Sequence, residues 1–314
     1  MLKLVSLLFL VLINQAYAET KKIDVVYGVD NRKEVYEVTN PLFLKLARST
    51  AGMVKLTNLK RESSSTDKYT LENTLTLGVT ENLCTSEKYI DQPVATECSA
   101  FLIGEDTLVT AGHCFIGRSQ APDMICKNAA WIFDFEMKNK KTDATKGISA
   151  QNIYTCKEII EAKRDIVHDY AIVRLSRKVV GREPLKYRTS GKIPSTTKLV
   201  VIGHPNALPT KITDGGKIID NSDSVRFVTN LDTFQGNSGS AVFDAETGMI
   251  EGILTEGKTD YRPSNPRLSQ SCQVLNKCQE DARRCDLEPM TDPAGEMVTR
   301  ITSLSSAILK ASRR

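Results

Sequence analysis

Short apolar runs separated by polar turn residues recur along most of the chain. Each run is rich in β-branched residues and is flanked by Gly, Asn or Asp, which is the pattern of β-strands. The runs lie at 100–103, 130–133, 171–175, 199–202, 225–228, 241–243 and 252–254. No regular alternation with long helical segments accompanies them. The chain is therefore predicted to be all-β, a sandwich or a barrel.

The two ends of the chain depart from this pattern. Lys3 precedes an apolar stretch at 4–13, and an Ala-x-Ala sequence follows at 16–18. This order predicts a secretory signal peptide cleaved after Ala18, and the stretch is too short to span a membrane. We therefore expect a secreted or periplasmic protein with no membrane span. Apolar residues at near-helical spacing in 301–310 (Ile301, Leu304, Ile308 and Leu309) predict a terminal helix.

Eight cysteines in an exported chain indicate disulfides rather than free thiols. Cys126 and Cys156 are a plausible pair. A second group is expected to pair within itself, in an order that the sequence leaves open: Cys84, Cys272, Cys278 and Cys285. A zinc site at the last three is disfavoured, because they contain no Cys-x-x-Cys pair and no histidine lies near them.

The charge of the chain is mild and dispersed. Its 314 residues carry a formal net charge of +4, and the Lys and Arg residues are scattered through polar loops. There is no basic stripe interleaved with aromatic residues, so nucleic-acid binding is not expected.

A glycine-rich loop around Ser238 is the strongest chemical signal. It reads Gly236-Asn237-Ser238-Gly239. A serine hydroxyl becomes a good nucleophile only when a base takes its proton, and the oxyanion that it forms needs N–H donors fixed in advance. Glycines allow a turn tight enough to aim the N–H groups of Gly236 and Ser238 into one small hole. Alone, the motif also occurs in ordinary turns.

A base and an acid occur upstream in a fitting order. His113 ends the apolar run 108–111 within Thr-Ala-Gly-His-Cys, and Asp169 leads into the apolar run 170–175. The order His, Asp, Ser is the chymotrypsin order. The two other histidines fit structural roles better. His168 adjoins Asp169, and neighbouring residues on a strand point to opposite faces. His204 lies in a Gly-His-Pro-Asn turn.

Together these three local patterns resemble the trypsin-like serine peptidases. The form of the serine loop, Asn-Ser-Gly-Ser-Ala-Val at 237–242, resembles the bacterial, glutamyl-endopeptidase-type branch. The similarity extends over approximately residues 50–310. It implies two packed six-stranded antiparallel barrels with a C-terminal helix, and a bridge between Cys98 and Cys114 that clamps the histidine loop.

The resemblance also implies a domain plan. Residues 1–18 would be the signal peptide, and 19–48 an N-terminal segment that maturation could remove. Residues 49–183 would form the first barrel, with His113 and Asp169. Residues 184–314 would form the second barrel, with Ser238, the specificity pocket and the helix.

In this family Ser238 would attack the scissile carbonyl, His113 would move the proton, and Asp169 would orient the imidazole. The N–H groups of Gly236 and Ser238 would bind the oxyanion. Neither a metal nor an organic cofactor is implied. The expected partners are protein or peptide substrates, and a monomer is expected.

The resemblance places Asp232, Thr233, Thr255 and Gly257 at the substrate. Asp232 stands six residues before the serine, where trypsin carries the acid that pairs with a basic side chain, so cleavage after Arg or Lys is predicted. Glutamate specificity is the alternative, suggested by the branch and by Thr233. Those peptidases use a histidine where this chain has Leu254. A third interpretation is that Asp232 points away and caps a turn.

Two other classes of protein fit the sequence less well. A catalytically dead scaffold or adhesion protein of the same fold usually lacks a triad member, and this chain keeps all three. A heat-shock-type periplasmic peptidase would carry a peptide-binding module, for which no segment is seen, and the cysteines argue against it. Trypsin's activating ion pair is also not expected, because the residue before the serine is the neutral Asn237.

Overall fold

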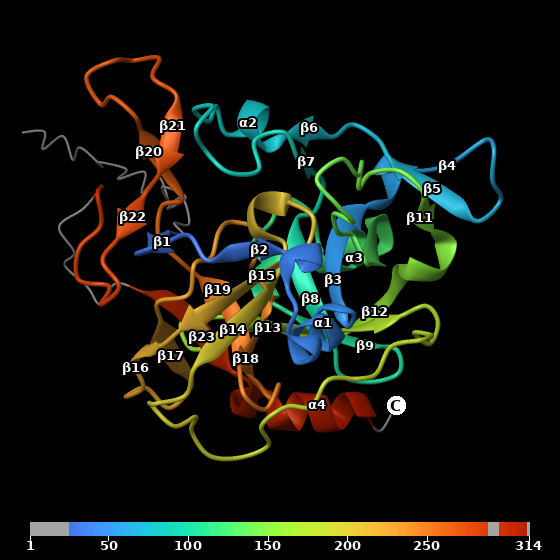
Figure 1. The fold of residues 1–314 in the computed structure, drawn as a ribbon. Coiled ribbons are helices and arrows are strands. Elements are labelled where there is room, and N and C mark those ends of the chain that lie inside the picture. The colour runs from blue at the N-terminus through green and yellow to red at the C-terminus, as the bar shows by residue number, and fades with distance from the viewer. Residues whose placement is uncertain (1–24, 288–294, 313–314) are drawn as a thin grey trace, which may run out of the picture.

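The computed structural model describes residues 25–287 and 295–312. The predicted signal peptide and its cleavage site after Ala18 lie outside the described residues. Two β-sheets form the body of the protein, with short helices on the outside (Figure 1). The all-β prediction and the two-part architecture are confirmed. Every predicted apolar run coincides with a strand, except that Ile103 and Val225 lie one residue outside β8 and β17.

The first sheet closes into a six-stranded barrel, in the order β10-β12-β13-β9-β8-β3. Its strands are β3 (Thr50–Lys55), β8 (Cys98–Leu102), β9 (Thr107–Thr110), β10 (Ala129–Phe133), β12 (Ile153–Arg164) and β13 (Asp169–Leu175). Every residue of β8, β9, β10 and β13 is buried. Strands covered on both faces read as continuous apolar runs, which is why these were visible in the sequence.

The second sheet differs from the six-stranded closed barrel that we expected. It is an eight-stranded sheet, in the order β16-β17-β23-β19-β18-β14-β15-β2. Its strands are β2 (Arg32–Glu34), β14 (Leu199–Gly203), β15 (Lys211–Gly216), β16 (Ile218–Asp220), β17 (Arg226–Thr229), β18 (Ala241–Asp244), β19 (Ile250–Glu256) and β23 (Glu296–Arg300). Strand β2 comes from the N-terminal segment. It pairs with β15 through its backbone, so its polar Arg-Lys-Glu sequence did not reveal it.

Smaller elements surround the two sheets. The minor strands are β1 (Val26–Tyr27), β4 (Leu59–Arg61), β5 (Lys68–Leu71), β6 (Leu75–Thr76), β7 (Pro93–Val94), β11 (Ile148–Ser149), β20 (Tyr261–Pro263), β21 (Gln273–Leu275) and β22 (Lys277–Cys278). The α-helices are α1 (Pro41–Ala47), α2 (Leu77–Thr80), α3 (Pro122–Asn128) and α4 (Ser305–Ser312). The 3-10 helices are η1 (Val35–Glu37), η2 (Leu56–Asn58), η3 (Gly112–Cys114), η4 (Ala150–Asn152), η5 (Pro205–Ala207) and η6 (Ile301–Leu304). In the part of the chain that the structure describes, no helix is long and apolar enough to cross a bilayer.

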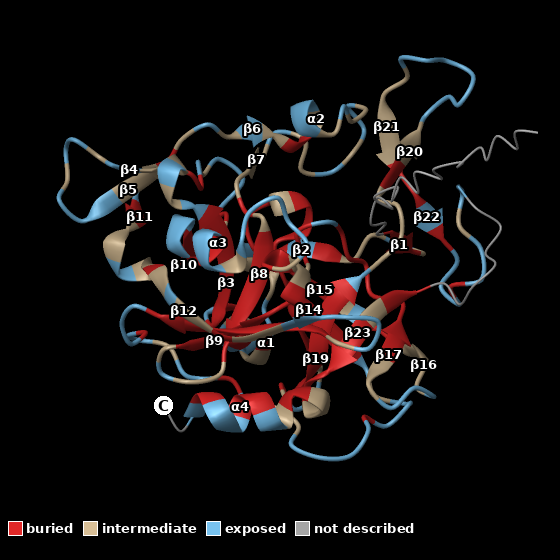
Figure 2. Ribbon diagram, turned by 180° about the vertical axis from the view of Figure 1, so that it is seen from behind, coloured by how far each residue is buried: buried red, intermediate tan, exposed pale blue. Residues whose placement is uncertain are grey.

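The predicted terminal helix is present as η6 followed by α4. Its buried face joins the core that the two sheets share, whereas Leu309 is 55% exposed and does not belong to that face. Figure 2 shows this helix with a buried inner side and an exposed outer side. The helix also touches the first barrel: Lys310 pairs with Glu161 at 3.2 Å, and Arg174 donates to the Ala311 carbonyl at 3.0 Å.

The eight cysteines form four disulfides. Cys98–Cys114 and Cys126–Cys156 are paired as expected, and the remaining four cysteines pair among themselves as Cys84–Cys272 and Cys278–Cys285. The Cys84–Cys272 bridge joins residues 188 positions apart. It ties the loop after α2 to the β20–β21 hairpin, so the long stretch after residue 264 is anchored at Cys272.

Candidate active site

His113 is placed by the tight 3-10 turn η3 that follows β9. The preceding Gly112 leaves no room for a side chain, since a Cβ there would lie 1.9 Å from the Lys163 carbonyl oxygen. The His113 backbone N–H donates to Asp169 Oδ1 at 2.8 Å, and its ring Nδ1 lies 2.8 Å from Asp169 Oδ2. Asp169 is the first residue of β13 and is 8% exposed. One carboxylate therefore fixes both the backbone and the ring of the histidine.

Two strands from different sheets hold the Ser238–Gly239 peptide group, one at its carbonyl and the other at its N–H. The Ser238 carbonyl accepts from the Ser99 N–H of β8 at 2.9 Å, and the Gly239 N–H donates to the Leu254 carbonyl of β19 at 2.8 Å. The disulfide sulfur of Cys114, next to His113, lies 4.0 Å from the same Ser238 carbonyl oxygen. The Cys98–Cys114 bridge therefore lies between the serine and histidine loops. The Ser238 side chain itself is half-buried.

The residues just before Ser238 form a tight turn with Gly236 at its third position. The Asn237 N–H donates to the Phe234 carbonyl at 2.9 Å, and Gly236 has φ of +96°. These are the marks of a type II turn, which needs positive φ at this position. A Cβ on Gly236 would lie 2.6 Å from the His204 carbonyl and 2.7 Å from the Ala207 nitrogen. Both the backbone conformation and the available space therefore require glycine.

The side chain of Asp232 faces the N-terminal segment. Its Oδ1 accepts the Tyr27 N–H and its Oδ2 accepts the Asn31 N–H, each at 2.7 Å, and the residue is 2% exposed. Burial raises the pKa of this carboxyl to about 7, against the lowering effect of the two amides. Among the roles expected for Asp232, this arrangement is closest to that of a residue that caps a backbone turn.

A second acid, which sequence reasoning missed, lies beside the other expected pocket residues. Glu296 begins β23 and is fully buried. It accepts hydrogen bonds from the Thr233 hydroxyl and, at 3.0 Å, from the Tyr27 hydroxyl. An acidic residue at the start of an apolar strand was the only signal available. The Thr255 hydroxyl donates to the Met297 carbonyl at 3.3 Å, so Thr255 lies next to this acid.

Gly257 and the two other histidines lie outside the hydrogen-bonded groups described above. Gly257 follows the end of β19 and is half-buried. His168 lies 3.4 Å from Asp165 in the β12–β13 turn, whereas His204 is fully buried and contacts the Leu208 carbonyl at 3.0 Å. Burial lowers the pKa of His204 to about 4, so this ring is neutral at ordinary pH. Neither histidine takes the place of His113 beside Asp169.

Comparison with known proteins bears on the family and the fold. Residues 98–253 match the family model of the trypsin-like peptidase domain. The chain is similar in structure to the VesB protease of Vibrio cholerae (14% identity, TM-score 0.50), covering 90% of this chain and 67% of that one. It is also similar to a Glu endopeptidase (15% identity, TM-score 0.49, covering 92% and 99%). The curated proteins contain no significant match to the sequence. At 14% identity the match to the VesB protease shows the fold alone.

Proposed function

We propose that the chain is a serine endopeptidase of the trypsin-like family, whose family model matches residues 98–253. In this proposal Ser238 is the nucleophile, His113 the base and Asp169 the residue that orients the base. The observation that carries this assignment is the double contact of Asp169 with the His113 backbone and ring. With Nδ1–H held by the carboxylate, the other ring nitrogen is the one left to accept a proton.

The reaction has two stages. Ser238 Oγ attacks the scissile carbonyl while its proton moves to His113, and the Asp169 carboxylate stabilises the imidazolium that forms. The tetrahedral intermediate collapses to an acyl-enzyme when His113 gives its proton to the leaving amine. A water molecule then attacks the ester with His113 again acting as base, and Ser238 is regenerated.

The oxyanion of each tetrahedral intermediate would bind the N–H groups of Gly236 and Ser238. The type II turn supports this role, because its positive φ sets the orientation of the peptide that carries the Gly236 N–H. Donors oriented in advance do not reorganise as the charge develops, which is why such groups contribute strongly to the rate.

We propose a preference for Arg or Lys before the scissile bond. A basic side chain that reached Thr233 would meet the buried carboxylate of Glu296. The same carboxylate would repel an acidic substrate side chain, which disfavours the glutamyl-endopeptidase alternative. Cleavage of a peptide library tests this point: a profile dominated by Glu or Asp before the cut would contradict it.

Export from the cytoplasm is proposed as well, either to the periplasm or to the exterior. Four disulfides support an oxidising compartment, because such bonds are rare where thiols are kept reduced. N-terminal sequencing of the protein purified from its host would locate the mature start. A start upstream of residue 19 would contradict the predicted cleavage after Ala18. The monomeric state remains a prediction, for which mass measurement in solution is the test.

Labelling with a fluorophosphonate serine probe tests the nucleophile. Ser238→Ala should abolish labelling and lower peptide hydrolysis by about 10⁴- to 10⁶-fold, while the unfolding transition stays near that of the wild type. His113→Ala should cause a comparable loss. His168→Ala is the matched control and should retain activity, since His168 contacts Asp165 instead of Asp169. Full activity in folded Ser238→Ala protein would overturn the assignment.

A further inference from the structure

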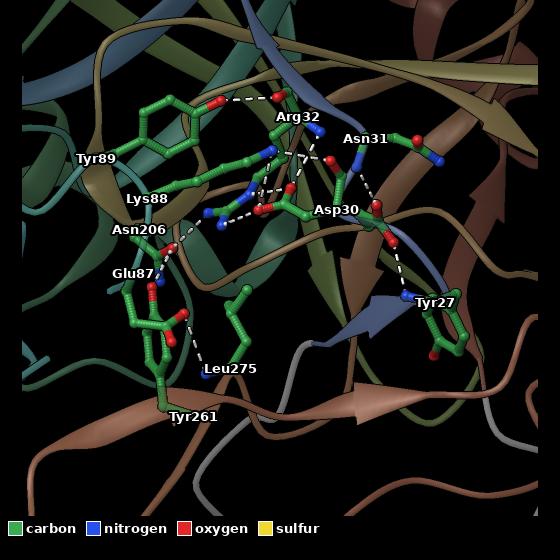
Figure 3. Close-up of polar contacts among 11 residues, drawn as sticks. Tyr27, Asp30, Asn31, Arg32, Glu87, Lys88, Tyr89, Asn206, Tyr261 and Leu275 are labelled. Atoms are coloured by element: carbon green, nitrogen blue, oxygen red, sulfur yellow. Dashed lines mark hydrogen bonds and ion pairs between the residues drawn. The ribbon is translucent and has the colours of Figure 1, made fainter. Parts of the chain in front are cut away.

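The N-terminal segment places a buried arginine directly against the serine loop. Arg32, in β2, is 3% exposed. Its guanidinium carbon lies 3.8 Å from the ring centroid of Phe234, the first residue of the turn that leads to Ser238, and 5.2 Å from that of Tyr89. Asp30 holds the same guanidinium through Nε at 3.0 Å and Nη2 at 2.9 Å. The cation is therefore neutralised and fixed in orientation (Figure 3).

Arg32 also reaches the loop that lies behind the serine turn. Its Nη1 donates to Asn206 Oδ1 at 3.4 Å, and the Tyr261 hydroxyl donates to the same oxygen at 3.0 Å (Figure 3). The Asn206 side-chain amide in turn donates to Asp260 Oδ2 at 3.0 Å. Asn206 and the next residue, Ala207, have φ of 53° and 62°. Two successive non-glycine residues with positive φ persist only when surrounding contacts hold them.

The strained loop holds one particular peptide group of the serine turn. The Asn206 N–H donates to the Gln235 carbonyl at 2.5 Å, and the Gln235 N–H donates to Asp260 Oδ2 at 3.3 Å. A trans peptide is planar, so its C=O and N–H point in opposite directions. With the Gln235 carbonyl held on Asn206, the Gly236 N–H must point away from Asn206. This N–H is the proposed oxyanion donor.

The side chain that precedes the serine does not supply a charge for this purpose. Asn237 is neutral and 2% exposed, and its side-chain oxygen accepts from Ser240 Oγ at 3.3 Å. The charged group that contacts the turn from the N-terminal segment is Arg32, through the ring of Phe234 and through Asn206.

We propose that Arg32 is a positioning residue of this peptidase: acting through Phe234 and Asn206, it holds the Gln235–Gly236 peptide with its N–H in the oxyanion hole. The N-terminal segment is thereby part of the active enzyme and not a detachable leader from Arg32 onward. This inference rests on the proposed function of Ser238 and Gly236. In this proposal the conformation of the serine turn depends on Arg32, a residue more than two hundred positions away along the chain.

The test compares Arg32→Met with Lys33→Met in the full protein. Methionine keeps most of the apolar stem of arginine and removes the cation. Lys33 is the neighbour in β2 and makes an exposed ion pair with Asp214 at 3.0 Å, so its variant controls for any general effect on the strand. Hydrolysis of the best substrate from the library and inhibition by the aldehyde of the same peptide are measured. The aldehyde forms a tetrahedral adduct on the serine and so depends on the oxyanion hole.

Arg32→Met should lower kcat by about 100-fold, because the loss of one oxyanion donor has an effect of this size. It should weaken inhibition by the aldehyde by a similar factor. KM should change little, and Lys33→Met should behave as wild type. Arg32→Lys keeps the charge without the planar fork and should recover part of kcat. A loss confined to KM, a loss equal to the unfolded fraction, or unchanged kcat would overturn the proposal.

A second variant covers the case in which Arg32→Met does not fold. Asn206→Gly accepts positive φ and keeps the backbone N–H, but it removes the side-chain link between Arg32 and Asp260. It should show the same fall in kcat and in aldehyde affinity, and normal values in folded protein would overturn the proposal. Failure of the underlying function is distinguishable, since wild-type protein would then show no probe labelling at Ser238.

Discussion

Replacing Gly236 by alanine should separate catalysis from folding at this site. The backbone there has φ of +96°, and the added Cβ would lie 2.6 Å from the His204 carbonyl and 2.7 Å from the Ala207 nitrogen. Both neighbours are backbone atoms of a loop held by several hydrogen bonds, so they cannot move aside easily. The turn can relieve the strain by rotating the Gln235–Gly236 peptide into a type I arrangement, which redirects the Gly236 N–H.

Two magnitudes follow from this geometry. If the native conformation persists, the strained backbone should lower the free energy of unfolding by about 1–3 kcal/mol. If the peptide rotates, stability is partly recovered but the oxyanion donor is lost, which should lower kcat by about 10²- to 10³-fold. We expect the peptide to rotate, because the added Cβ would press against backbone atoms that cannot move aside easily. KM should change much less than kcat, since the oxyanion forms after substrate binding.

The assay combines steady-state peptide hydrolysis with urea unfolding of the same protein. Gly191→Ala is the matched control, because Gly191 also has positive φ (+74°) but has no neighbouring atom within 4 Å of an added Cβ. It should cost about 1–2 kcal/mol of stability and leave kcat unchanged. Wild-type kcat in folded Gly236→Ala protein would refute the role of this turn. An equal loss of kcat in both variants would show that strain alone accounts for it.

Three further predictions concern the surroundings of the site. Removing the Cys98–Cys114 bridge, which spans 16 positions, should lower the free energy of unfolding by about 3 kcal/mol in urea, and an unchanged value would contradict its role as a clamp. His204, with its pKa lowered to about 4 from 6.5, stays neutral in the folded protein while the unfolded chain takes up a proton, so stability should fall as pH decreases from 6.5 to 4. Urea unfolding at pH 7 and pH 5 should show a loss about 2 kcal/mol larger in wild type than in His204→Gln, and equal losses would exclude this residue as the cause. Asp232→Ala removes both acceptors for the amides of Tyr27 and Asn31 and should lower the free energy of unfolding by about 2–4 kcal/mol. Selectivity for Arg in a peptide library should stay largely unchanged. A lost preference for Arg would show that Asp232 contacts the substrate.

Local sequence patterns were sufficient to predict the apolar buried strands and the candidate residues at the ends of those strands. The runs that became β8, β10 and β13 are buried along their whole length, so their apolar character was visible without any knowledge of their partners. His113 and Asp169 each border such a run, so both could be located from the strand pattern. The glycines at 236 and 239 likewise reflect local backbone conformation, with φ of 96° and 90°.

The interpretation of Asp232 depended on information that the sequence does not contain. Its position relative to Ser238 was clear, but the direction of its side chain is decided by the amides of Tyr27 and Asn31, some two hundred positions away. Glu296 was missed for the same reason, since its meaning comes from the Thr233 and Tyr27 hydroxyls that contact it. An acidic side chain shows no pattern in sequence that distinguishes a solvated residue from a buried one.

The sequence by itself therefore determined the fold class, the positions of the apolar buried strands and the candidate triad, because each of these depends on periodicity and turn chemistry within a few residues. The tertiary structure alone decided the pairing of Cys84 with Cys272, the addition of β2 to the second sheet and the contact of Arg32 with the serine turn. Each of these joins segments far apart along the chain. Such contacts depend on the packing of the whole molecule, and polar backbone pairing of the kind made by β2 leaves no hydrophobic pattern in the sequence.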